Sequence, residues 1–257
     1  MKEFITKIDG EKTYVRYNDL PGDKIPLVFI PGWGCAGSFD FIETACQKGL
    51  EDHRRILIDL LGAGYSDSPR DFDYLPESHA AYIVELLDDL GLDRLVIYAH
   101  SMGGRIAIAL AELLGDRLEG MILAEGSMVQ EYFPYMGEGE EKFVQEYFHK
   151  MLRSLARKED QQFLSTVRLC LPEALYREAR EMMSEDSGNW ERIYFKGDYG
   201  KVFIVGEETD DEGFDLENIR EAQIPIISIP QAGHTMNWDL PLETSQAILG
   251  ALEILGL

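Results

Sequence analysis

Residues 95–104, which read LVIYAHSMGG, constrain the fold of this chain more than any other stretch. The first five are apolar or aromatic and include β-branched side chains, as expected for a buried strand. The run ends near Ser101, and residues 105–114 then show the Ala-, Ile- and Leu-rich pattern of a helix. A strand that turns sharply at a serine into a helix is the arrangement of a nucleophile elbow, in which the turn exposes the hydroxyl group.

Small residues on either side of Ser101 fit this interpretation. In an elbow the strand and the helix pass close together, so large side chains two positions before and two after the serine would collide. Gly103 occupies one of these positions, and Ala99 occupies the other, where glycine is usual. The motif alone also fits an ordinary strand-to-helix turn, so the rest of the chain must decide between the two.

Composition narrows the class of protein. The chain has 257 residues, 45% of them hydrophobic, which suits one large domain or a core with an insert. No apolar run approaches the ~20 residues that span a bilayer, and the N-terminus has no apolar signal segment, so we expect a cytoplasmic protein. A net charge of −23 argues against nucleic acid and anionic membranes as partners. Cys35, Cys46 and Cys170 are too few and too widely spaced to predict a disulfide framework or a zinc cluster.

Short apolar runs that alternate with helical patterns predict an α/β fold, with a mainly parallel eight-stranded sheet flanked by helices. The predicted strands are residues 3–8, 13–17, 27–30, 56–59, 95–99, 121–124, 202–205 and 226–229. The clearest predicted helices outside the elbow are residues 78–90 and 242–255. Because the first runs have no helical pattern between them, we expect the sheet to begin as an antiparallel meander.

The alternation stops in residues 127–199, where no strand pattern occurs. We therefore expect a core domain made of residues 1–126 and 200–257 and a helical cap insertion at 127–199. Helical patterns within the insertion cover residues 143–155, 160–170 and 172–184. Residues 132–151 are rich in aromatic and Met side chains, which we expect to pack onto the core and in part to line an apolar pocket.

Four motifs together resemble the α/β-hydrolase family of esterase- and lipase-like serine hydrolases with a helical cap. They are the elbow, IPGWG at residues 30–34, DLLGAGYS at 59–66, which is similar to the family's D-x-x-G-x-G-x-S loop, and AGH at 232–234. Each follows a predicted strand, and their order matches the family. The resemblance implies the α/β-hydrolase fold with a cap. We expect the loop at 59–66 to be structural, because its Asp and Ser can satisfy nearby backbone groups.

The motifs assign Ser101 as the nucleophile and His234 as its base. A serine hydroxyl is a weak nucleophile at neutral pH and needs a base within hydrogen-bond reach. His234 follows the last strand, whereas His100, beside the serine, should point elsewhere and support the elbow. The other histidines lie away from the strand-end loops or in the insertion: His53, His79 and His149.

The acid that orients the histidine is less firmly indicated. The resemblance places it after the seventh strand, three residues beyond Gly206, but that position is Thr209, which cannot carry the charge. A second location in the family is the end of the sixth strand, where Glu125 stands. We therefore expect Glu125 to be the acid, with Asp210 as the alternative and Asp211 after it.

Two backbone amides are expected to form an oxyanion hole, which stabilises the tetrahedral intermediate of acyl transfer. Met102, directly after the nucleophile, supplies one. In the family the loop after the third strand begins with His-Gly, and the next residue supplies the other. Here Pro31 and Gly32 occupy those positions, so Trp33 is the second candidate. The missing histidine affects how the loop is braced rather than the donor itself.

The resemblance implies a hydrolase that cleaves a small, neutral and apolar carboxylic ester through an acyl-enzyme. It implies no metal or organic cofactor, a small-molecule ester as partner, and a monomer or homodimer. Acidic clusters at residues 138–141 and 207–221 are expected to form a soluble, self-repelling surface. The alternative is that they form an acidic rim that disfavours anionic substrates, since the second cluster falls near the predicted site. Alternatives are cleavage of a thioester, lactone, amide or C–C bond, and a hydrolase-like protein that binds a ligand with little turnover, because the fold alone does not fix the function.

Overall fold

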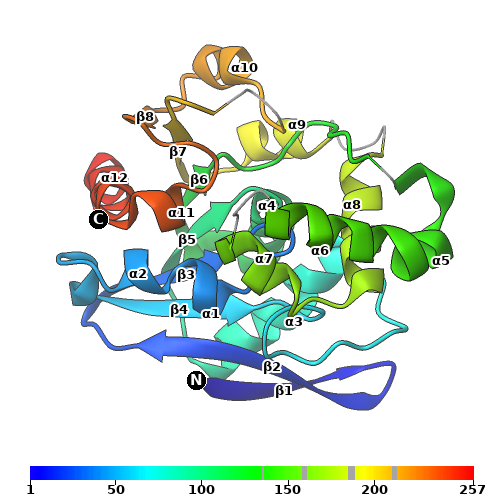
Figure 1. Cartoon of the computed structure of the whole chain (residues 1–257). Helices are drawn as coiled ribbons and strands as arrows, with labels where there is room; N and C mark the ends of the chain where they lie inside the picture. The colour runs from blue at the N-terminus through cyan, green and yellow to red at the C-terminus, as the bar shows by residue number, and fades with distance from the viewer. Residues whose placement is uncertain (135, 158–160, 185–188, 210–212) are drawn as a thin grey trace.

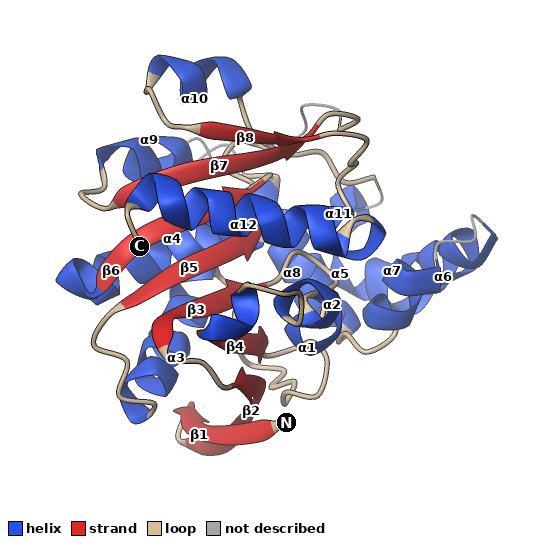
Figure 2. Ribbon diagram, turned by 90° about the vertical axis from the view of Figure 1, so that its left-hand side faces the viewer, coloured by secondary structure: helices blue, strands red, loops and turns tan. Residues whose placement is uncertain are grey.

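In the computed structural model the chain forms an eight-stranded sheet with helices on both faces (Figures 1 and 2). The structure describes residues 1–134, 136–157, 161–184, 189–209 and 213–257. The strands are β1 (Lys2–Ile8), β2 (Glu11–Leu20), β3 (Lys24–Ile30), β4 (His53–Asp59), β5 (Leu95–His100), β6 (Leu118–Ala124), β7 (Gly200–Gly206) and β8 (Ile226–Ile229). All eight predicted strands are confirmed, and the fold is that of an α/β hydrolase.

The prediction of an initial antiparallel meander is wrong beyond the first hairpin. The strand order is β1-β2-β4-β3-β5-β6-β7-β8; β2 is antiparallel to both neighbours, and the strands from β4 to β8 are parallel. Strand β3 therefore lies inside the sheet rather than next to β2. The reason is its burial, because Leu27 and Phe29 pack into one apolar layer and Val28 and Ile30 into the other. A strand that is apolar on both faces belongs where helices cover both faces.

Two helical layers bury the sheet, and their short members were not predicted from the sequence. One layer includes α3 (Pro76–Asp89), α4 (Gly103–Leu114) and α9 (Asn189–Lys196). The opposite layer includes α1 (Gly37–Asp40), α2 (Ile42–Ala45), α11 (Met236–Asp239) and α12 (Pro241–Leu255). A further helix, α10 (Leu216–Glu221), connects β7 to β8. Helices of one or two turns are too short to show an apolar periodicity, so the sequence pattern predicts the long ones only.

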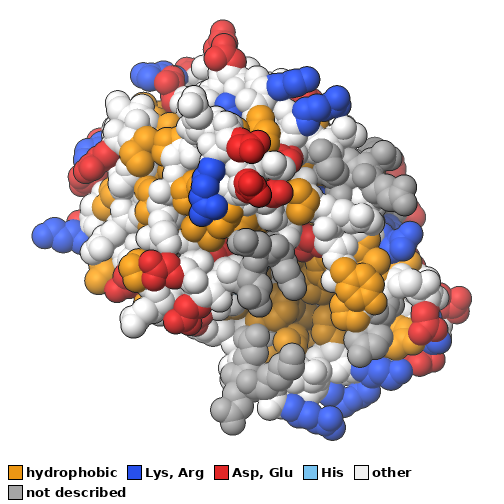
Figure 3. Space-filling model, turned by 90° about the horizontal axis from the view of Figure 1, so that it is seen from above, with side chains coloured by type: hydrophobic (Ala, Val, Ile, Leu, Met, Phe, Trp, Pro, Cys, Tyr) orange, Lys and Arg blue, Asp and Glu red, His pale blue; other side chains and the backbone are white. Residues whose placement is uncertain are grey.

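The segment between β6 and β7 is helical, and Figure 2 shows helices α5 to α8 beyond the carboxyl ends of the parallel strands. It contains α5 (Glu140–Lys142), a π-helical turn (Phe143–Tyr147), α6 (Phe148–Arg157), α7 (Gln161–Val167) and α8 (Pro172–Met182). The three predicted helices correspond to these elements, although the first begins with the π-helical turn. Several of these helices share a separate apolar cluster. Seen from above, hydrophobic side chains gather in a hollow with scattered charged side chains around it (Figure 3). That residues 127–199 form a separate cap remains a prediction.

The loop after β4 makes the contacts expected of a structural element. The Asp59 carboxylate accepts hydrogen bonds from the amides of Ser38 (2.7 Å) and Tyr65 (2.9 Å). The Ser66 hydroxyl donates to the Asp59 carbonyl at 2.6 Å and accepts from the Arg16 amide at 2.7 Å. These bonds tie the loop to α1 and β2 and place it next to, but outside, the site described below.

Candidate active site

Ser101 lies at the sharp turn between β5 and α4. Its φ is +53°, in the left-handed region that non-glycine residues seldom occupy. The Ser101 amide donates to the Ala124 carbonyl at 3.1 Å, and the Ser101 carbonyl accepts from the amides of Gly104 (2.9 Å) and Ser127 (2.8 Å). Such strain costs on the order of 1–3 kcal/mol and persists only where the surroundings enforce it, as these bonds do here.

Gly103 makes the turn possible. A Cβ at this position would lie 2.5 Å from the carbonyl oxygen of Ile30 and 2.7 Å from that of Pro31. These carbonyl oxygens belong to the backbone and have little freedom to move away. Ala99, the other small residue, is completely buried in the same region. The absence of a side chain at position 103 therefore lets α4 pass close to the carboxyl end of β3.

Glu125 occupies the corresponding position on the neighbouring strand, directly after β6. Its φ is +48°, and its amide donates to the Ile204 carbonyl at 2.9 Å. The side chain is buried, with one carboxylate oxygen accepting from the Gly206 amide at 2.8 Å. The other oxygen lies 2.6 Å from Nδ1 of His234. Glu125 and His234, 109 residues apart, therefore form one hydrogen-bonded pair beside the serine.

The electrostatics of this pair favour a carboxylate and a basic imidazole. Burial alone would raise the pKa of Glu125, but the hydrogen bonds from His234 and Gly206 hold it below its ordinary value of 4.5. Burial alone would lower the pKa of His234, but the hydrogen bond and the charge of Glu125 raise it above its ordinary value of 6.5. Because Nδ1 faces the carboxylate, Nε2 is left to exchange protons.

His100 supports the histidine loop rather than the serine. Its Nε2–H group donates to the carbonyl of His234 at 2.8 Å, and the two rings lie 4.7 Å apart between centroids. Burial, and then the nearby charge of His234, lower the pKa of His100 to about 3. A neutral, fully buried imidazole that holds the backbone of His234 fits a supporting role.

The two expected oxyanion donors lie beside the nucleophile. Among the described residues no carbonyl or side chain accepts a hydrogen bond from the amide of Trp33 or of Met102. A Cβ on Gly32 would lie 2.9 Å from the Cβ of Ser101, so the loop after β3 passes directly over the serine. The Trp33 indole N–H donates to the Leu175 carbonyl of α8 at 2.9 Å. This bond braces a loop that has Pro31 where the family usually has histidine.

Two cavities meet at Ser101 and His234. The apolar cavity, of about 210 Å³, has largely aromatic and aliphatic walls that include Trp33, Phe133, Phe163, Met182 and Trp238. The polar cavity, of about 340 Å³, lies on the Glu125 side and is further lined by Ser127, Glu131, Glu208 and Thr209. The Trp33 side chain therefore lines the apolar cavity and also packs against Phe133, with 5.2 Å between the two ring centroids.

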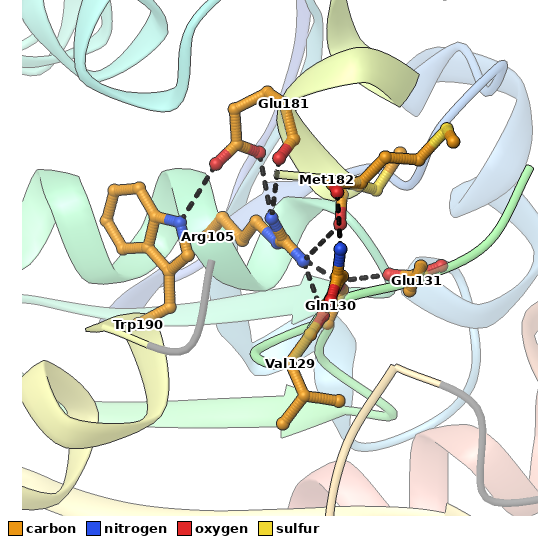
Figure 4. Close-up of polar contacts among 9 residues, drawn as sticks. Arg105, Val129, Gln130, Glu131, Glu181, Met182 and Trp190 are labelled. Atoms are coloured by element: carbon orange, nitrogen blue, oxygen red, sulfur yellow. Dashed lines mark hydrogen bonds and ion pairs between the residues drawn. The ribbon is translucent and has the colours of Figure 1, made fainter. Parts of the chain in front are cut away.

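Arg105, which the sequence reasoning missed, ties α4 to the walls of these cavities (Figure 4). Its side chain is completely buried. It donates to the Ser127 hydroxyl at 3.1 Å, the Val129 carbonyl at 2.6 Å and the Glu181 carboxylate at 3.0 Å. Ser127 in turn donates to Glu131. A charged residue within the apolar pattern of residues 105–114 was the signal that could have drawn attention to it.

Other expected residues lie outside this arrangement. Asp210 and Asp211, the alternative acids, fall outside the described residues, while Thr209 borders the polar cavity. Within the described residues no group of three or more His, Cys, Asp or Glu side chains is arranged to hold a metal ion. No described helix combines the length and apolar character needed to cross a membrane.

Comparison with known proteins identifies the family to which this chain belongs. The family model of the alpha/beta hydrolase fold matches residues 25–239, and the chain belongs to that family. A thermophilic esterase from Thermogutta terrifontis superimposes with a TM-score of 0.79 over the whole of both chains. At 21% identity, this likeness shows the fold alone.

The curated relatives match only part of this chain. Haloalkane dehalogenase 2 of Mycobacterium bovis is 40% identical over 116 residues, which cover 45% of this chain and 39% of the dehalogenase. The 2-hydroxymuconate semialdehyde hydrolase of Pseudomonas putida is 30% identical over 102 residues, 40% of this chain and 36% of that enzyme. The chain thus spans less than half the length of either relative. Their different reactions show that the family is one of hydrolytic enzymes with several chemistries.

Proposed function

We propose that this protein is a serine hydrolase that cleaves small, neutral carboxylic esters through an acyl-enzyme intermediate. The observation that carries the proposal is the hydrogen-bonded pair of Glu125 and His234 beside a serine held at a strained strand-to-helix turn. A nucleophile, a base and an acid that orients the base are the three parts that acyl transfer to serine requires.

In the proposed reaction, Nε2 of His234 takes the hydroxyl proton as Oγ of Ser101 attacks the ester carbonyl carbon. The oxyanion that forms accepts hydrogen bonds from the amides of Trp33 and Met102. Glu125 keeps Nδ1–H of His234 in place and stabilises the imidazolium. The imidazolium then gives its proton to the departing alkoxide as the C–O bond breaks, which leaves an acyl group on the serine.

Water completes the cycle. His234 takes a proton from water as the water oxygen attacks the acyl carbon. The bond to Oγ of Ser101 breaks, the serine recovers its proton from His234, and the carboxylic acid leaves. We place the acyl arm in the apolar cavity, because it must stay bound during this step. The polar cavity then serves the departing alcohol and the entering water, both of which prefer polar surroundings.

The serine argues for an acyl substrate rather than an alkyl halide. Displacement of a halide by Oγ of Ser101 would form an ether, which water activated by His234 could not cleave. The dehalogenation named for one relative is therefore not proposed here. The acidic side chains Glu131 and Glu208 border the polar cavity, so a neutral leaving group fits it better than an anionic one.

A fluorophosphonate probe tests the proposal, because it labels only an activated serine. We expect intact-mass analysis to show one stoichiometric adduct on the wild-type protein and none on Ser101→Ala. Ser165→Ala, which changes an exposed serine on α7, is the matched control and should label fully. Absence of an adduct on folded wild-type protein would remove the serine hydrolase proposal and favour a ligand-binding protein.

A further inference from the structure

The loop between β3 and α1, residues 31–36, carries Trp33, and its far end is held by a side chain of α7. The Ala36 amide donates to the hydroxyl oxygen of Thr166 at 2.7 Å. Both residues are buried, each 1% exposed. A buried backbone N–H needs an acceptor, and here a residue 130 positions away in the sequence supplies it.

A tight turn connects this contact to Trp33. The Cys35 amide donates to the Gly32 carbonyl at 3.2 Å, which closes a four-residue turn with Trp33 and Gly34 at its centre. One end of the turn is fixed at the serine, because a Cβ on Gly32 would lie 2.9 Å from the Cβ of Ser101. Ala36 directly follows the other end. The direction of the Trp33 amide therefore depends on how Ala36 is held.

Helix α7 also packs against the turn. A Cβ on Gly34 would lie 3.0 Å from Cγ2 of Val167 and 3.2 Å from Cε2 of Phe163, so both side chains lie directly against the loop. The φ of Gly34 is +71°, which other residues seldom adopt. The ring of Phe163 lies 6.3 Å from that of Trp33 between centroids. The contact between α7 and the loop thus combines a buried hydrogen bond with close packing.

The core offers this loop little bracing of its own at its first residue. Pro31 has neither a backbone N–H nor a polar side chain, so it cannot tie the loop to its surroundings by donating a hydrogen bond. The contacts that hold the loop come instead from the segment between β6 and β7: Thr166 on α7 binds the Ala36 amide, and the Leu175 carbonyl on α8 binds the Trp33 indole.

We propose that Thr166 is a positioning residue for the oxyanion hole: its hydroxyl oxygen holds the Ala36 amide and, through the turn, directs the Trp33 amide at the oxyanion. The inference rests on the proposed function, because an oxyanion forms only when Ser101 attacks a carbonyl group. It follows that the hole is complete only while α7 lies on the loop, so movement of α7 away from the loop lowers kcat.

Variants of Thr166 test the proposal through kcat and KM for p-nitrophenyl butanoate. Thr166→Val keeps the shape but not the acceptor, so kcat should fall roughly 10- to 100-fold while KM changes less than about twofold, since the lost alignment matters mainly in the transition state. Thr166→Ser keeps the acceptor and should retain kcat to within a few-fold. If Thr166→Val does not fold, Thr166→Cys, whose sulfur is a weaker acceptor, takes its place and should show a smaller loss of kcat in the same direction.

Thr6→Val is the matched control. Its hydroxyl is also buried and donates to Glu85 at 2.7 Å, but it lies on the edge strand β1. Loss of this bond should affect the melting temperature and leave kcat unchanged. The comparison separates the loss of a threonine hydrogen bond in general from the loss of the one that holds the loop.

A trifluoromethyl ketone gives a readout that a merely structural role would not move. Oγ of Ser101 adds to the ketone carbon, the hydroxyl proton passes to His234, and the ketone oxygen becomes an oxyanion that the hole must bind. In Thr166→Val the inhibition constant should rise by the same factor as kcat/KM falls. Binding of the ester to Ser101→Ala, measured by calorimetry, should not change when Thr166→Val is added.

The outcomes distinguish the two proposals. Wild-type kcat in the folded variant that lacks the hydroxyl, a loss confined to KM, or an equal loss in Thr166→Ser would overturn the positioning role while leaving ester hydrolysis intact. If wild-type protein cleaves no ester and forms no adduct with the ketone, the proposed function fails, and the role of Thr166 fails with it.

Discussion

Replacing Glu125 by glutamine tests the proposed triad most directly, because it changes the charge and one hydrogen-bonding atom but not the shape. In the wild-type structure one carboxylate oxygen accepts from the Gly206 amide at 2.8 Å and the other lies 2.6 Å from Nδ1 of His234. Glutamine can keep the first bond with its oxygen. Its NH₂ group must then face Nδ1, which becomes an acceptor.

The size of the effect follows from the tautomer. When Nδ1 of His234 accepts, Nε2 carries the proton and cannot take one from Ser101. The same change in the Ser-His-Asp proteases lowers kcat about 10⁴-fold. We expect kcat here to fall roughly 10³- to 10⁴-fold, or about 4–5.5 kcal/mol of transition-state stabilisation, with little change in KM.

The assay is p-nitrophenyl ester hydrolysis together with the rate of fluorophosphonate labelling, on protein whose melting temperature is measured in parallel. Glu208→Gln is the matched control, because Glu208 borders the polar cavity but is exposed. It should keep activity to within a few-fold. Asp210→Asn tests the alternative acid. Activity of folded Glu125→Gln within tenfold of wild type, or a greater loss in Asp210→Asn, would refute the assignment.

Three further outcomes are expected. His234 acts as a base only when it is neutral, and its pKa is raised above 6.5. The pH profile of kcat/KM should therefore have its midpoint above pH 6.5, and at lower pH kcat/KM should fall tenfold per pH unit. A midpoint below pH 6.5 would contradict the contact with Glu125. In Gly103→Ala the added Cβ would lie 2.5 Å from a backbone carbonyl oxygen, so the free energy of unfolding measured in urea should fall by about 1–3 kcal/mol. An unchanged free energy of unfolding would contradict this prediction and would mean that the turn relaxes. Arg105→Met strands the buried partners of the guanidinium and should cost about 3–5 kcal/mol in the same measurement; near-wild-type stability would show that Glu181 and its neighbours find other partners.

The sheet could be predicted from the sequence because its strands carry continuous apolar runs and end at recognisable motifs. The meander prediction failed because the absence of a helical pattern between the first strands was taken to mean that these strands pair in the order of the sequence. Burial on both faces, as in β3, would have been the better guide. The short helices α1, α2, α10 and α11 were missed, since four to six residues show no periodicity.

The positions of Ser101 and His234 in the candidate site could be predicted, because each residue lies at a fixed distance from a strand end. The place of Glu125 could be anticipated because Thr209 cannot carry a charge. Arg105 was not predicted, because its role depends on contacts between segments far apart in sequence. Arg105 contacts Glu181, which lies 76 residues away in the sequence, and no local sequence pattern predicts this contact.

The two left-handed residues at the ends of β5 and β6 have a consequence for how such an enzyme could diversify. With Ser101 and Glu125 on adjacent central strands, the reacting groups depend on the most buried part of the sheet. On the proposed assignment of Glu125 as the acid, the turn after β7 supplies no catalytic residue, although Glu208 and Thr209 of that turn border the polar cavity. That turn can vary in length and composition to suit new alcohols, so a mutant library focused there should change preference while most members stay active.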